Sequence, residues 1–76
     1  MQEAYILLNA EAGKEDVLLR SIRQIPAVYD VVGVYGVYDI IVQVRANQYK
    51  EVEEAASKIR EMPSVKATFT MLVIQN

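Results

Sequence analysis

Two seven-residue segments of this chain are similar to each other, and their repetition limits the possible folds more than any other feature. The chain contains Ile22-Arg23-Gln24-Ile25-Pro26-Ala27-Val28 and, later, Ile59-Arg60-Glu61-Met62-Pro63-Ser64-Val65. In each copy a proline ends an amphipathic run, and a valine two residues later begins a new extended segment. Each half is therefore predicted to hold one strand-helix-strand unit. Two copies are fewer than the roughly three repeats that a solenoid needs to bury its faces.

Hydrophobic periodicity divides both halves in the same way. Strands are predicted over residues 3–9, 28–35, 38–45 and 65–74, and helices over residues 14–25 and from residue 47 to the second proline. In the first helix Leu18, Ile22 and Ile25 recur at helical spacing, with acids in the first turn and a base in the last. Asn47 is a suitable N-cap for the second helix, and Gly36 marks a tight turn between the middle strands.

The predicted order is therefore β-α-β-β-α-β. Two right-handed units of this kind interleave into a four-stranded antiparallel sheet with both helices on one face, which is the ferredoxin-like α+β sandwich. A length of 76 residues leaves room for one domain, residues 1–76, and for no second one.

The strands are more apolar than a sheet with one solvated face requires. We assign one face of the third strand to the helices; it holds Tyr38, Ile40, Val42 and Val44. The opposite face contains Ile41, and the first and last strands are apolar on both faces. Two helices can cover only one face, so the other is expected to be covered by a second subunit. We expect at least a dimer, and a larger even-numbered ring.

The composition argues against several classes of function. Cysteine and histidine are both absent, which removes disulfides, thiolate metal sites and the usual general base and nucleophile. The adjacent acids Glu15 and Asp16 are interpreted as a solvated helix face. No spacing supplies a metal site and no glycine loop supplies a phosphate site, so we expect no catalytic residues, no metal and no cofactor.

Charge and hydropathy narrow the possible partners. The net charge is −2, so the balance of charged residues does not favour binding to a polyanion. The middle strands carry tyrosines with almost no basic residues, which disfavours RNA binding by the sheet. No apolar run approaches the roughly 20 residues that span a bilayer. We therefore expect a cytoplasmic protein without a membrane segment.

The hairpin between the middle strands, Val34-Tyr35-Gly36-Val37-Tyr38-Asp39, is the strongest candidate site. The carboxylate of Asp39 could hold an ammonium group, and N–H groups freed by the turn could hold a carboxylate. Alternatively Asp39 caps the turn or keeps a sheet edge soluble. Spacing alone favours the second interpretation.

Residues around this hairpin resemble a known family. Gly36-Val37-Tyr38-Asp39-Ile40-Ile41-Val42, the later proline-valine strand entry and Thr68-Phe69-Thr70-Met71-Leu72-Val73 are similar to the effector (RAM) domain of Lrp/AsnC transcriptional regulators. The resemblance covers nearly the whole chain. It implies a ferredoxin-like domain that dimerises through its sheets, often forms rings of dimers, and binds amino acids between dimers. Carried over by position, the effector site comprises Gly36, Tyr38, Asp39, Thr70 and Met71.

The chain also departs from that family. Full-length members begin with a DNA-binding helix-turn-helix, whereas this chain begins in the first strand, and Ser64 replaces the usual glycine after the second proline. We therefore expect a stand-alone effector domain that does not itself bind DNA, and that senses alone or joins full-length Lrp/AsnC regulators. Three alternatives stay open: an ACT-like regulatory domain with ligands near the first loop, a ferredoxin-like dimeric enzyme with a polar cavity beneath its helices, and a purely structural oligomer.

Overall fold

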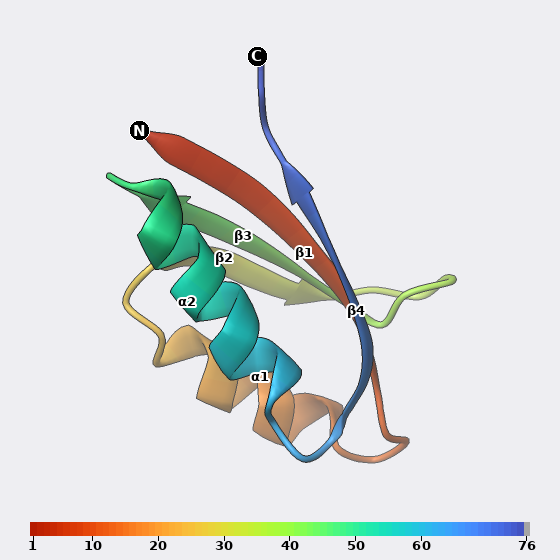
Figure 1. Cartoon of the computed structure of the whole chain (residues 1–76). Coiled ribbons are helices and arrows are strands. Elements are labelled where there is room, and N and C mark those ends of the chain that lie inside the picture. The colour runs from red at the N-terminus through yellow and green to blue at the C-terminus, as the bar shows by residue number, and fades with distance from the viewer. Residues whose placement is uncertain (76) are drawn as a thin grey trace.

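The computed structural model describes residues 1–75 and contains six elements. These are β1 (Gln2–Ala10), α1 (Glu15–Arg23), β2 (Val28–Gly33), β3 (Ile40–Ala46), α2 (Tyr49–Arg60) and β4 (Val65–Leu72). The strands form one antiparallel sheet in the order β2-β3-β1-β4, and both helices lie on one of its faces (Figure 1). The predicted ferredoxin-like βαββαβ fold is confirmed.

The repeated segment forms the same helix exit twice. After α1 the N–H of Ile25 donates to the carbonyl of Ile22 at 3.0 Å, and after α2 the N–H of Met62 donates to the carbonyl of Ile59 at 3.1 Å. A second hydrogen bond then joins the first residue of the next strand to Ile25 or Met62, respectively. The proline that follows each of these residues cannot donate a hydrogen bond and cannot continue the helix. Similar residues thus produce equivalent turns in the two halves.

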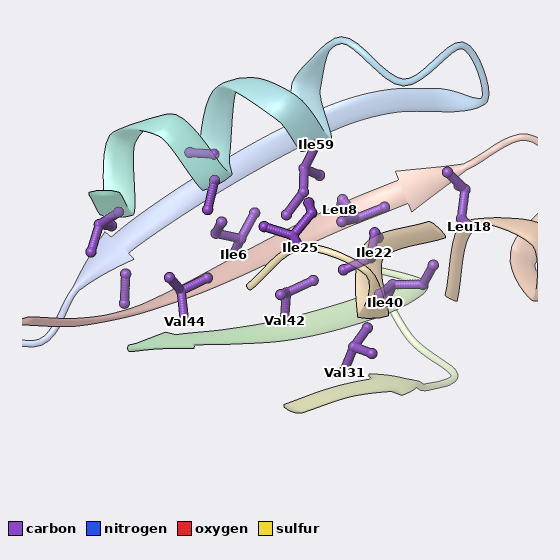
Figure 2. Packing of buried hydrophobic residues seen from close by; sticks show 14 of the residues in the cluster. Ile6, Leu8, Leu18, Ile22, Ile25, Val31, Ile40, Val42, Val44 and Ile59 are labelled. Carbon is purple, nitrogen blue, oxygen red and sulfur yellow. The ribbon is translucent and has the colours of Figure 1, made fainter. Parts of the chain in front are cut away.

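The core lies between the helices and the inner face of the sheet (Figure 2). The register places Ile6 opposite Val42 and Leu8 opposite Ile40, so these side chains share the helix-covered face. The largest fully buried side chains are Ile6, Leu8, Ile22, Ile40, Ile59, Val42, Val44 and Val52. Burial of each contributes about 1.5–3 kcal/mol. Among the described residues no polar or charged residue is buried, so this interior is a filled apolar layer.

The connection between β2 and β3 differs from the prediction. β2 ends at Gly33 and β3 begins at Ile40, so residues 34–39 form a loop that projects beyond the sheet (Figure 1) rather than a tight turn at Gly36. Tyr38 belongs to this loop and does not lie on the helix-covered face. Its ring meets that of Phe69 edge to face, with centroids 5.6 Å apart. Because the ladder between the two strands stops at Gly33 and Ile40, strand alternation no longer fixes the direction of Tyr38.

The start of α2 allows a prediction about stability. The N-cap is Gln48 rather than the predicted Asn47, and the carboxylate of Glu51 accepts the N–H of Gln48 at 3.1 Å. This bond satisfies one donor near the start of the helix, as in a capping box. Glu51→Ala is therefore expected to lower the free energy of unfolding by about 0.5–1 kcal/mol in chemical denaturation. Glu53→Ala, which removes an exposed acid from the same helix, is the control, and equal losses would refute the capping role.

Candidate functional site

The face of the sheet opposite the helices carries a continuous apolar surface. Leu7 of β1 lies directly opposite Ile41 of β3 and Phe69 of β4, and Ile41 lies opposite Val32 of β2. Next along β1 and β4, Tyr5 lies opposite Met71. Phe69 is 56% exposed and Met71 is 52% exposed. We call the surface formed by Tyr5, Leu7, Val32, Ile41, Phe69 and Met71 the open face. An apolar surface that crosses all the strands of a sheet is typical of an interaction site.

Asp39 ties the projecting loop to the end of β1. Its N–H donates to the carbonyl of Leu8 at 3.0 Å, and its carbonyl accepts the N–H of Val34 at 2.8 Å. Its carboxylate oxygen Oδ2 accepts the N–H of Ala10 at 2.9 Å. Asp39 therefore has a structural role, because it joins the loop to the end of β1. The other carboxylate oxygen, Oδ1, receives no hydrogen bond from residues 1–75 and remains available as an acceptor.

Asp39 also lines a surface hollow of about 380 Å³ between the first turn of α1 and the projecting loop. Its other lining residues are Glu15, Asp16, Leu19, Gly33, Val34 and Tyr35. Three of the lining side chains are acids and none is basic, a composition that favours a cationic group such as an ammonium. The sequence alone indicates a solvated helix face for Glu15 and Asp16. Only the topology, which brings the start of α1 beside the loop, places them near Asp39.

The loop itself offers hydrogen-bond donors. Within the described part of the chain, the N–H groups of residues 35–38 have no backbone acceptor. Gly36 has a φ angle of +154°, a conformation that other residues rarely adopt. Tyr35 and Val37 beside it are almost fully exposed. The loop therefore presents apolar side chains together with unpaired donors that could bind a carboxylate.

The two predicted site residues of β4 lie apart from the loop residues Gly36 and Asp39. Thr70 and Met71 are consecutive in a strand, so their side chains point to opposite faces of the sheet. Met71 belongs to the open face, whereas Thr70 lines a smaller hollow against α2. β1 separates β4 from β3. One protomer does not bring the five predicted residues together, so a site that uses all of them requires more than one subunit.

No metal site emerges from these acids. Within residues 1–75, no group of three or more Asp or Glu side chains is placed to hold a metal ion. Neither helix of this part of the chain has the length and apolarity needed to cross a membrane.

Comparison with known proteins decides the family. The model of the Lrp/AsnC ligand binding domain matches residues 3–76, nearly the whole chain. This chain belongs to the Lrp/AsnC ligand-binding domain family. Among curated relatives of this Lrp/AsnC domain, the HTH-type transcriptional regulator FL11 of Pyrococcus horikoshii is 29% identical over 72 residues. That match covers 95% of this chain and 48% of the regulator, so the chain spans about half the length of the curated relatives it matches.

Several solved structures share the fold of this chain. The protein in the crystal structure of FFRP-DM1 is 37% identical, with a TM-score of 0.90, and the match covers 97% of this chain and 100% of that one. Hypothetical protein PHS023 from Pyrococcus horikoshii is 36% identical, with a TM-score of 0.89. That match covers 100% of this chain and 93% of PHS023. Escherichia coli AsnC, at 19% identity, shares the fold with a TM-score of 0.87 over 99% of this chain and 52% of its own.

These findings bear on the alternatives. The family match favours an Lrp/AsnC domain over an ACT-like domain. The acid-lined hollow does adjoin α1, so position alone would not have separated the two. The enzyme alternative required a polar cavity beneath the helices, and that space is filled by apolar side chains. The family match therefore identifies the chain as an Lrp/AsnC ligand-binding domain.

Proposed function

We propose that this domain is a non-enzymatic amino-acid sensor that forms dimers through the open face and binds its effector where dimers meet. The observation that carries the proposal is Asp39, which lies in an acid-lined hollow next to a loop with unpaired N–H groups. An amino acid presents an ammonium and a carboxylate, and these two features supply a partner for each. The family match supports a regulatory ligand, and the choice of an amino acid is our inference.

The spread of the five site residues supports a site between subunits. Gly36, Tyr38 and Asp39 would come from one protomer, and Thr70 or Met71 from a neighbour. A protomer of a neighbouring dimer would also exclude water from the hollow, which strengthens a charge-assisted hydrogen bond to the ammonium. Assembly and ligand binding would then be linked, so that each affects the equilibrium of the other.

A thermal-shift screen against the twenty amino acids tests this proposal. A ligand that binds only the folded protein raises its stability by about 2.7 kcal/mol at a concentration one hundred times the dissociation constant. We expect a concentration-dependent rise in melting temperature with one amino acid or a chemically related group of them. No rise with any of the twenty at millimolar concentration would contradict the proposal.

The proposed role in transcription is indirect. We propose that the domain acts in the cytoplasm, alone or by joining full-length Lrp/AsnC regulators, without contacting DNA. Both helices within residues 1–75 pack on the sheet and none is free to enter a major groove (Figure 1), and the net charge is −2. The purified protein is therefore expected not to retard duplex DNA in gel-shift experiments at about 150 mM salt, which is close to physiological ionic strength. Sequence-specific retention under those conditions would show the opposite.

A further inference from the structure

One charged cluster interrupts the outer surface of the sheet. The Nε atom of Arg45 lies 2.8 Å from a carboxylate oxygen of Glu3, and its guanidinium carbon lies 3.7 Å from the ring centroid of Tyr29. Glu3, Arg45 and Tyr29 come from β1, β3 and β2, and Glu3 and Arg45 are directly opposite in the ladder. This is the only ion pair among the described residues, and we call the three residues the polar clamp.

The polar clamp lies at one end of the outer surface. In β1, Glu3 is followed on the same face by Tyr5 and Leu7, which belong to the open face. The side chains of Arg45 and Glu3 are already only 35% and 21% exposed in the protomer. A subunit that covers the open face and extends to this end would remove most of their remaining contact with water.

Burial changes the energetics of this pair. A partly exposed ion pair contributes only about 0–1 kcal/mol. Once buried, an intact pair is close to neutral, whereas removal of one member leaves an uncompensated charge that is strongly unfavourable. The Nε atom of Arg45 lies at ion-pair distance from Glu3 but makes no hydrogen bond within residues 1–75, so this donor and the other N–H groups of the guanidinium must face polar groups or solvent in any complex. A register that slides them over Leu7 or Ile41 of a partner would leave them unsatisfied.

A second copy of this chain is the occupant that fits this surface. The charges of Glu3 and Arg45 cancel within the protomer, so this ion pair leaves no net charge of its own at this end of the surface. An apolar surface with an internally neutralised end is complementary to an identical surface. It offers little to a strongly charged partner.

We propose that the polar clamp determines the register and the partner specificity of homodimerisation through the open face. It favours dimerisation with an identical subunit in the register of the two sheets that keeps the ion pair intact and satisfies the remaining donors of Arg45. It disfavours slipped registers and partners that present only apolar groups. This inference rests on the self-association proposed above and adds the residues that direct it.

A double-mutant cycle on the dimer dissociation constant tests the role of the clamp. In sedimentation equilibrium, Glu3→Leu and Arg45→Met are each expected to raise the constant at least about tenfold, because each leaves a single charge in the interface. The combined Glu3→Leu/Arg45→Met variant is expected to return within about threefold of the unmodified protein or to bind more tightly. Lys66→Met is the control: it removes an exposed charge away from the open face and should leave the dimer dissociation constant unchanged.

Each result bears on the inference. If the unmodified protein dimerises and all three clamp variants stay within about threefold of it, the clamp lies outside the interface and the inference fails while self-association stands. A monomeric unmodified protein would overturn both. Loss of melting temperature without a change in the dissociation constant would assign the clamp to the stability of the protomer alone.

Subunit exchange tests the specificity directly. When the double variant is mixed with the unmodified protein, native mass spectrometry is expected to find fewer mixed dimers than random pairing gives. In a mixed dimer the donors of Arg45 would face the apolar side chains that replace the partner's clamp. Mixed dimers at the random proportion would overturn the proposed selectivity.

Discussion

Ile41→Asp is expected to convert the assembled protein into monomers. Ile41 lies at the centre of the open face, between Leu7 of β1 and Val32 of β2. In a symmetric dimer the substitution places an unpaired carboxylate in the interface from each subunit. An uncompensated buried charge costs about 3–5 kcal/mol, so the dimer dissociation constant should rise roughly a hundredfold to a thousandfold or more.

Light scattering on both proteins checks this expectation. Val17→Asp is the matched control, because Val17 is also an aliphatic residue, 49% exposed, but lies on α1 away from the open face. The control should keep the mass of the unmodified assembly. An unchanged mass for Ile41→Asp would show that the interface lies elsewhere.

The second large effect concerns Asp39. If its carboxylate holds the ammonium of the effector, the charge-assisted hydrogen bond contributes about 1.5–3 kcal/mol. Asp39→Ala is therefore expected to weaken amino-acid binding roughly tenfold to a hundredfold or more in calorimetric titration. The same substitution also removes the acceptor of the Ala10 N–H, so a fall in melting temperature is expected as well. Melting temperature alone therefore cannot separate a binding role from a structural one.

Asp39→Asn separates the two roles. The amide oxygen of asparagine can still accept the N–H of Ala10, so most of the stability should be retained. The negative charge is lost, so affinity for the amino acid should fall. The affinity of Asp39→Asn should lie between that of the unmodified protein and that of Asp39→Ala. If Asp39→Asn and Asp39→Ala both bind with unchanged affinity, Asp39 serves only the loop.

The fold was predictable because its determinants are local. The repeated helix exit, the helical spacing of Leu18, Ile22 and Ile25, and the apolar alternation of β3 each act over a few residues, and together they allow few topologies. The projecting loop was not predictable in this way. Its length depends on where the ladder between β2 and β3 stops, and residues 34–38 are apolar enough to continue either strand.

The candidate site was predictable only in part. The hairpin position of Asp39 follows from the sequence, but its hydrogen bond to Ala10 joins residues that are 29 positions apart and depends on the finished sheet. The approach of Glu15 and Asp16 to the loop depends on how α1 packs. The separation of Thr70 from Met71, in contrast, follows from strand alternation and could have been read directly from the sequence.

A crystal structure of the protein with the amino acid selected by the thermal-shift screen tests the central claim most directly. The account predicts the ligand between subunits, with its ammonium within hydrogen-bond distance of the Asp39 carboxylate and its carboxylate on N–H groups of residues 35–38. Thr70 or Met71 of a neighbouring subunit should contact the same ligand. A ligand held within a single protomer and away from Asp39 would contradict the account.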